Sequence, residues 1–171
     1  LGCLEEQVAQ AVRRWQVGGA LIRHGDGLVL VCNRRRDSSV EWTPPGGVID
    51  RGETLLQGLA REVLEETGLV VESWGGRSYT VAVDAPDMGW RLAVEAWEVA
   101  SVSGEVVLAD PDGIVEQVRH ASLAEAPGLL NGSPPWVQTP VVDWLNGSAR
   151  AGYRFVLHGT RRASAQVERV E

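Results

Sequence analysis

Apolar residues follow two different spacings along this chain, and the switches between them predict strands and helices in alternation. Residues 15–23 and 28–32 are rich in β-forming residues and flank the turn signal Gly25-Asp26-Gly27, which predicts a β-hairpin. Residues 33–40 are mostly charged or polar and predict a loop. Residues 42–47 contain two prolines and two glycines, and this composition predicts irregular structure.

Helical spacing follows in three segments. The strongest signal spans Thr54 to Thr67, and Gly68 stands where a C-cap is expected. On this helix we expect an apolar stripe to face the core, formed by Leu56, Ala60, Val63 and Leu64. Residues 5–14 predict a short leading helix, and residues 134–145 predict a late helix that begins with prolines.

Strand signals fill most of the remaining chain, at residues 70–83, 91–102, 114–121 and 153–158, and a polar tail follows. No repeat or linker divides the sequence, so we predict one domain over residues 1–171, with a short N-terminal helix and a C-terminal strand and tail. The order of elements predicts an α/β fold of the α+β type, with a mixed sheet between helices.

Composition excludes several classes of protein. No apolar run reaches the roughly 18 residues of a membrane helix, and the first 14 residues lack the apolar core of a signal peptide, so we expect a cytoplasmic protein without a membrane partner. The net charge of −7 makes nucleic acid an unfavourable partner for the surface as a whole. The two cysteines and three scattered histidines predict neither a disulfide framework nor a zinc site.

Candidate chemistry concentrates in the predicted helix at residues 54–67. Glu62, Glu65 and Glu66 occupy positions i, i+3 and i+4 and therefore share one helix face. Three carboxylates on one stripe repel each other and destabilise an isolated helix, unless a cation compensates them. A hard divalent ion with oxygen ligands suits them, and Mg²⁺ is the common choice where the substrate is a phosphate.

The loop before this helix supports the same interpretation. Gly46 and Gly47 allow a sharp turn and a close backbone approach, which would present a carbonyl oxygen to the same cation. Glu53 stands at the predicted helix start, where an acid is favoured by the helix dipole and is able to cap free N–H groups. Arg61 lies two turns further on and is long enough to reach Glu53 or a neighbouring carboxylate.

Together these residues resemble the Nudix box. Its pattern is a glycine, a glutamate, the pair Arg-Glu, an aliphatic residue, the pair Glu-Glu, a glycine and an aliphatic residue at fixed spacing. This chain matches it at every position, with Gly47, Glu53, Arg61, Glu62, Val63, Glu65, Glu66, Gly68 and Leu69. A chance match in a chain of this length has a probability on the order of 10⁻⁸ to 10⁻⁷ from average residue frequencies.

The resemblance implies an α/β/α sandwich fold and an enzyme that hydrolyses a phosphoanhydride bond in a nucleoside diphosphate linked to another group. Glu65 and Glu66 would be the main ligands of Mg²⁺, or of Mn²⁺ as the alternative ion, with the Gly46 carbonyl as a further ligand. Glu62 would be a ligand or the base that takes a proton from water, although some members place the base on a loop outside the box. Arg61 and Glu53 would orient these carboxylates.

Outside the box the sequence offers candidates with an ordinary structural alternative for each. Glu116, with Asp112 before it, resembles the late acid that adds to the metal site in many Nudix proteins, but it is equally an exposed acid. Arg34 and Arg36 belong to an arginine run that would contact substrate phosphate or simply be solvated. Trp42 precedes the glycine loop and would either stack on a base or pack in the core.

Two other functions compete with catalysis of this kind. The first is a catalytically inactive Nudix-fold protein with a nucleotide-binding or regulatory role, against which stands the complete set of box acids. The second is an RNA-binding module that uses the arginine-rich stretch after residue 150. The substrate remains open between a nucleoside triphosphate, ADP-ribose, an NDP-sugar and similar molecules. Homodimers are common in the family, and residues 153–158 are the candidate for pairing across an interface.

Overall fold

The computed structural model describes residues 11–107, 113 and 115–170. Its larger sheet is mixed and has six strands in the order β10-β9-β6-β7-β1-β5. The strands run parallel where β1 meets β7 and where β6 meets β9, and antiparallel at the other contacts. The six strands are β1 (Arg13–Leu21), β5 (Gly46–Val48), β6 (Val70–Ala85), β7 (Trp90–Ser103), β9 (Gly152–His158) and β10 (Gln166–Val170).

A smaller antiparallel sheet stands beside it and is centred on β3 (Gly27–Arg34), which pairs with the other three strands. These strands are β2 (Arg23–His24), β4 (Val40–Thr43) and β8 (Val115–Ala121). A register shift between β3 and β8 falls at Cys32 and Asn33, opposite Glu116.

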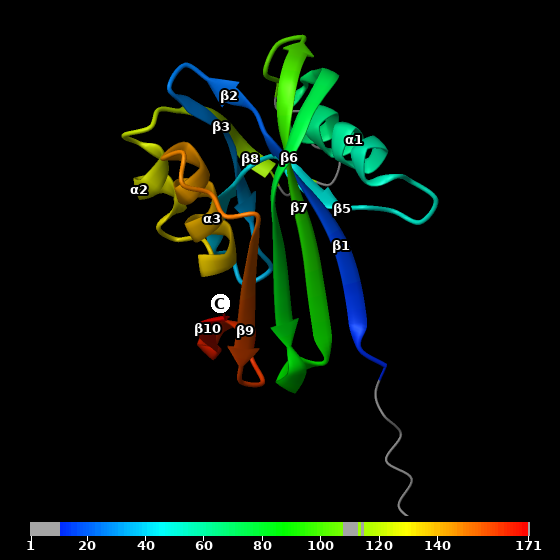
Figure 1. Ribbon diagram of the computed structural model, residues 1–171, viewed down its shortest axis with the longest axis vertical. Coiled ribbons are helices and arrows are strands. Elements are labelled where there is room, and N and C mark those ends of the chain that lie inside the picture. The colour runs from blue at the N-terminus through cyan, green and yellow to red at the C-terminus, as the bar shows by residue number, and fades with distance from the viewer. Residues whose placement is uncertain (1–10, 108–112, 114, 171) are drawn as a thin grey trace, which may run out of the picture.

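Helices cover the strands on both sides, and Figure 1 shows α1 (Leu55–Thr67) opposite α2 (Ala126–Leu130) and α3 (Pro135–Leu145). Two separate cores result. The larger joins one face of the six-stranded sheet to α2, α3 and strand β3. The smaller places Leu59 and Val63 of α1 against Ala20, Ile22 and Val29. The predicted layered α/β fold with a mixed sheet is confirmed, and no helix among the described residues is long and apolar enough to cross a membrane.

The predicted hairpin is present, but its first strand is divided. β1 pairs with β7 and β5, whereas only the two residues of β2 pair with β3 across the predicted turn. The segment that contains β1 and β2 therefore contributes a strand to each sheet, because the chain crosses from one sheet to the other at Ile22. The prediction of a single paired hairpin over this run was wrong.

The prediction of irregular structure at residues 42–47 was also wrong. Residues 40–43 and 46–48 form β4 and β5, and the two prolines lie in the short connection between them. Gly46 has a φ of +153°, and a side chain there would place its Cβ 2.1 Å from the Gly18 carbonyl oxygen. Glycine thus lets β5 lie close against β1, where a bulkier residue would prevent pairing.

The helix at the box begins after Thr54, which is its N-cap and forms a capping box with Gln57. Gly68 ends it in the left-handed conformation, as predicted. The predicted apolar stripe needs correction, because Leu64 is 47% exposed and Leu59 is fully buried instead. The core-facing side therefore runs along Leu59, Val63 and Glu66, so it adjoins the acidic face and does not oppose it.

The two ends of the chain also differ from expectation. Residues 5–10 of the predicted leading helix lie outside the described residues, and Arg13 and Arg14 of that segment belong to β1. The segment expected as a polar tail contains β10, which pairs with β9 and extends the large sheet to its outer edge. Alternation in β10 is weak because its residues are largely exposed, which explains why its sequence did not predict a strand.

Candidate active site

The candidate site lies where the second half of α1 passes the edge strand β5. Helix and strand are joined by the loop at residues 49–54, in which Gly52 has a φ of +90°. Glu53 accepts a hydrogen bond from the Asp50 N–H at 3.2 Å. It does not cap the helix, as the sequence had suggested, since Thr54 takes that position. This frees the Glu53 carboxylate to face Arg61 two turns along the helix.

Arg61 is the centre of the site. Its Nε and Nη2 donate to the two oxygens of Glu53 at 2.8 and 3.1 Å, which is a bidentate pair. Its Nη1 donates to Glu62 at 2.9 Å and to Glu65 at 3.2 Å. The predicted reach from Arg61 to Glu53 is thus present, and one guanidinium links three of the box carboxylates.

This network changes the protonation equilibria of its members. Hydrogen bonds from Arg61, supported by the Asp50 N–H, hold the pKa of Glu53 below its usual value. The hydrogen bond to Glu53, with the neighbouring Glu62, raises the pKa of Arg61. Both groups are therefore charged throughout the neutral range, which keeps the network intact at physiological pH.

Glu66 lies one turn after Glu62 on the same face of the helix, and its side chain is largely buried at 8% exposure. The Gly46 N–H donates to its Oε2 at 2.8 Å. Between β1 and β5, the Ala20 N–H donates to the Pro45 carbonyl and the Ile49 N–H donates to the β1 backbone. This alternation makes Gly46 and its partner in β1 a pair that exchanges no hydrogen bond. Its carbonyl therefore points to the same outer side as its N–H, toward α1.

Two glycines make room for the carboxylates. A Cβ on Gly47 would lie 2.6 Å from the Glu62 Cδ, so the side chain of Glu62 packs directly on the bare backbone of β5. A Cβ on Gly58 would lie 2.7 Å from Glu53 Oε2. Gly58 is a residue that sequence reasoning missed, and a glycine inside a strong helix was the available signal.

The donor set suits a hard divalent cation. Carboxylates of Glu62 and Glu65 already converge on one positive nitrogen, Arg61 Nη1, and the Gly46 carbonyl adds a neutral oxygen. Among the described residues, no three His, Cys, Asp or Glu side chains are arranged closely enough to hold a metal ion as they stand. Engagement of a cation would thus require Glu62 and Glu65 to turn away from Arg61.

The candidates outside the box lie in other surroundings. Glu116 forms an ion pair with Arg34 at 2.5 Å, so the structure brings together a predicted metal ligand and a predicted phosphate contact. Arg36 is exposed on the β3–β4 loop. Trp42 is half-buried and packs against the larger core, which favours the structural alternative for this residue. Asp112 lies outside the described residues.

Sequence reasoning missed two further charged contacts. Asp50 Oδ2 lies 3.5 Å from Arg61 Nη2 and adds a fourth acid to that guanidinium. Glu41 joins Arg35, at 2.5 Å, to Arg162 of the C-terminal segment, at 3.3 Å. The second contact spans 121 positions in the sequence, and no local pattern predicts it.

Comparison with known proteins agrees with this geometry. A MutT-like protein of Streptomyces ambofaciens is 41% identical over 139 residues, which cover 79% of this chain and 88% of that protein. An RNA pyrophosphohydrolase of Caulobacter vibrioides is 30% identical over 77% of this chain and 86% of its own length. A match to the RNA pyrophosphohydrolase of Mesorhizobium japonicum spans only 40% of that protein.

The fold comparison points the same way. The crystal structure of a mutator MutT protein from Bacillus halodurans has a TM-score of 0.64 at 20% identity, over 91% of this chain and 97% of that chain. The sequence profile of the NUDIX domain matches residues 12–145. With a complete box on α1, a matching fold and these relatives, the chain belongs to the Nudix family of pyrophosphohydrolases.

Proposed function

We propose that the protein hydrolyses a phosphoanhydride bond in a nucleoside diphosphate linked to another group, with Mg²⁺ as the metal and Mn²⁺ as a substitute. The observation that carries this proposal is the Arg61 network. It directs the carboxylates of Glu53, Glu62 and Glu65 at one guanidinium, and Glu66 accepts a hydrogen bond from the Gly46 N–H. Such a preorganised cluster of oxygen donors is costly unless a cation uses it.

Each residue has a distinct part in this proposal. Glu65, Glu66 and the Gly46 carbonyl hold the cation, with Glu62 as a further ligand or as the base that accepts a proton from the attacking water. Arg61 and Glu53 orient these carboxylates. When bound, the cation neutralises the diphosphate and makes water a better nucleophile at neutral pH. Glu116 is proposed to join the metal site from β8, which requires it to leave Arg34.

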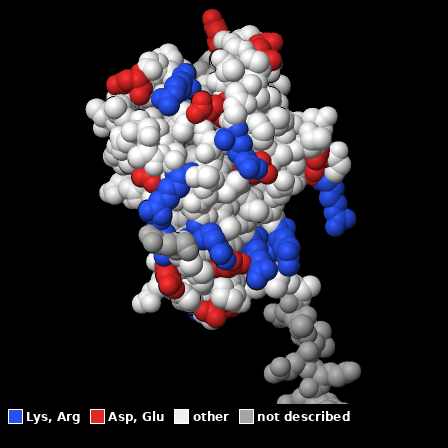
Figure 2. Space-filling view, viewed as in Figure 1, with Lys and Arg blue, Asp and Glu red and all other residues white. Residues whose placement is uncertain are grey.

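The nucleotide end of an RNA chain is the second candidate substrate. Its support is the name of two relatives, which are RNA pyrophosphohydrolases. Against an extended RNA surface stands the mixture of charges on the face in Figure 2, where arginines and acids are interspersed. In the six-stranded sheet, Arg91 forms an ion pair with Asp84, and Arg77 forms one with Glu95. We therefore place the free nucleotide first.

One substrate panel tests both candidates. Nucleoside triphosphates, ADP-ribose, NDP-sugars and a short 5′-triphosphate RNA are incubated with the protein and Mg²⁺, Mn²⁺ or excess EDTA, and released phosphate and nucleoside monophosphate are measured. We expect turnover of at least one nucleotide that EDTA abolishes and added Mg²⁺ restores. Turnover of the RNA alone would favour the second candidate.

The inactive alternative makes the opposite prediction in the same assay. A nucleotide-binding or regulatory protein would bind members of the panel without releasing product under any metal condition. A pure RNA-binding module would retain RNA on a filter at low salt and hydrolyse nothing. Size-exclusion chromatography of the same preparation would test whether the protein forms a homodimer.

A further inference from the structure

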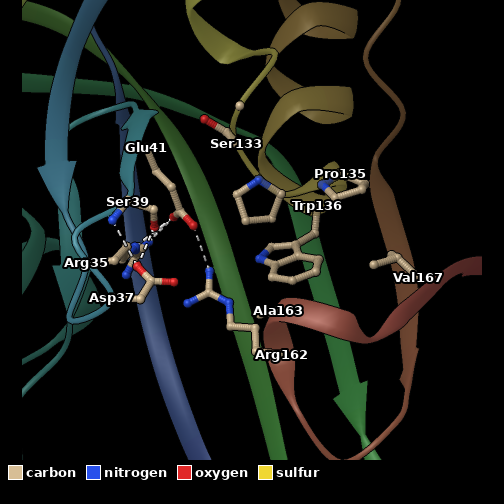
Figure 3. A pocket seen from close by; sticks show the side chains of 12 residues that line it. Arg35, Asp37, Ser39, Glu41, Ser133, Pro135, Trp136, Arg162, Ala163 and Val167 are labelled. Atoms are coloured by element: carbon tan, nitrogen blue, oxygen red, sulfur yellow. Dashed lines mark hydrogen bonds and ion pairs between the residues drawn. The ribbon is translucent and has the colours of Figure 1, made fainter.

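A hollow of about 310 Å³ lies away from the box, and none of its lining residues belongs to the box. Three segments that are distant in the sequence build it. These are the β3–β4 loop with Glu41 of the adjoining β4, the first turn of α3 with Trp136, and the C-terminal segment with Arg162 and Val167. Figure 3 shows the carboxylate of Glu41 and the indole of Trp136 on opposite walls, with Arg162 closing the hollow between them.

Ion pairs hold these walls in place. Glu41 is only 12% exposed, and it binds both Arg35 of the loop and Arg162 of the C-terminal segment. The Arg162 guanidinium also lies 5.7 Å from the centre of the Trp136 ring, a cation–π distance. Arg162 thereby connects the acidic wall to the aromatic wall, and its side chain is 43% exposed.

The chemistry of the lining suits a flat, polar heterocycle. One wall is apolar and contains prolines, the Trp136 ring and Val167, while the other carries two arginines and two acids of balanced charge. A balanced lining does not attract a bare polyphosphate, but it offers a surface for stacking together with hydrogen-bond donors and acceptors. A nucleobase with its ribose has both properties.

The hollow is also connected to the candidate active site through the chain. Glu41 lines the hollow and Gly46 stands at the box, five residues further on, so the two are at most about 18 Å apart along a fully extended chain. Ser133 in the lining donates to the Trp42 carbonyl at 2.6 Å and fixes that stretch against α3. A molecule that reached the box with its phosphates could thus place its other end here.

We infer that the C-terminal segment selects the substrate by completing a nucleoside-binding hollow, and that Arg162 is its specificity-determining residue. This segment lies beyond residues 12–145, which match the family profile, and it joins two lining segments that lie within them. The inference rests on the proposed function for the identity of the substrate. Arg162 contacts the nucleoside, while the proline side chains and Val167 form the apolar wall against which the base packs.

The test measures binding without catalysis. ADP, GDP, CDP and UDP are titrated into the whole chain in EDTA, with tryptophan fluorescence and calorimetry as readouts, and inorganic pyrophosphate is the probe that lacks a nucleoside. We expect R162A to weaken binding of the preferred nucleoside diphosphate about tenfold, because it removes hydrogen bonds from a charged donor. Pyrophosphate binding should not change. R162K should recover only part of the loss, since lysine cannot form the planar fork.

The neighbouring residue Arg161 provides a matched control. Arg161 is exposed and does not line the hollow, so R161A removes the same charge from the same segment without touching the proposed contact. W136F keeps an aromatic ring in a residue that is 8% exposed, and it should reduce the fluorescence response while the protein stays folded. Circular dichroism and melting temperature of each variant verify folding.

The outcomes separate the two proposals. Equal weakening by R161A and R162A, or unchanged nucleoside binding in R162A, would overturn the role of Arg162. Binding that depends on Arg162 in a protein that hydrolyses nothing would overturn the proposed function and leave the hollow intact. Hydrolysis of nucleotides with a KM that R162A leaves unaltered would support the proposed function and overturn the role of the hollow.

Discussion

The box and the hollow differ in how the chain builds them. The box occupies residues 46–69, and its acids meet because a single helix and the adjoining strand bring them to one face. The hollow combines residues 35–41, 132–136 and 162–167, which meet only after both sheets have formed. Charges in the box are concentrated and of one sign around a single arginine, whereas charges in the hollow are balanced.

This difference matches the two proposed roles, catalysis at the box and selection of the substrate at the hollow. Catalytic groups need fixed mutual geometry, which a short rigid element supplies with few degrees of freedom. A selective wall has to differ between relatives, and a segment that contributes nothing to the box is able to change without disturbing it. Changes in the box should therefore affect turnover, and changes in the hollow should affect affinity.

The largest effect is expected from the two acids assigned to the cation. Glu65→Gln or Glu66→Gln should lower kcat by about 100-fold or more, because each removes a charged ligand. Both substitutions keep the side-chain shape, and the amide oxygen introduced by Glu66→Gln would still accept the hydrogen bond from Gly46. Melting temperature should change little, and near-normal rates in both variants would contradict the metal assignment.

A glycine substitution at the strand should have the next largest effect. Gly47→Ala places a methyl group 2.6 Å from the present position of Glu62 Cδ, so this carboxylate has to move. We expect a loss of about 10- to 100-fold in kcat with KM nearly constant. Gly19→Ala is the control, since a Cβ there meets nothing within 4 Å. If both variants lose the same activity, strand pairing and not Glu62 explains the result.

A substitution in the lining of the hollow should have a smaller effect than those in the box, and it should act mainly on stability. Ser133→Ala removes the hydrogen bond to the Trp42 carbonyl from a largely buried position. The free energy of unfolding in urea should fall by about 1 kcal/mol. KM should rise modestly because the wall loosens, while kcat stays near the wild-type value. A change confined to kcat would show that the hollow and the box are not separable in this way.

The smallest effect concerns Glu53, and it is lost in acid. Arg61 lowers the pKa of Glu53 in the folded state, so this pair stabilises the protein above the unfolded-state pKa, near 4.5. The contribution is lost as the pH falls through the lowered folded-state value. Wild type and Glu53→Gln should therefore differ most in unfolding free energy at pH 6 to 7. The difference should shrink as the pH falls below 4.5, and a constant difference from neutral pH into this acidic range would exclude ionisation of Glu53 as its source.

Sequence reasoning succeeded where the interactions are local. The helix at residues 54–67, its glycine cap and the contact between Arg61 and Glu53 follow from spacing within one element. It failed at residues 42–47, because proline and glycine normally interrupt a strand. Pairing with β1 overrides that preference here, since Gly46 fits where a Cβ would collide with Gly18.

The orientation of α1 shows the same limit within a single helix. Periodicity places Leu64 and Leu59 about equally well on an apolar side, but only the position of β1 decides between them. Gly18 leaves room for Leu59, whose Cβ would lie 3.1 Å from an added methyl group. The helix consequently rotates until Glu66 is largely buried, a result that hydrophobicity alone argues against.

By itself, the sequence determined the family of this protein and the residues proposed for its chemistry, because one contiguous motif contains them and its spacing already sets which acids share a face. Tertiary structure alone decided that Glu116 pairs with Arg34, that Glu41 reaches Arg162, and that the last strands wall a hollow. These contacts join segments separated by 80 residues or more. Their energies appear only when the sheets close, so no local pattern in the chain is able to predict them.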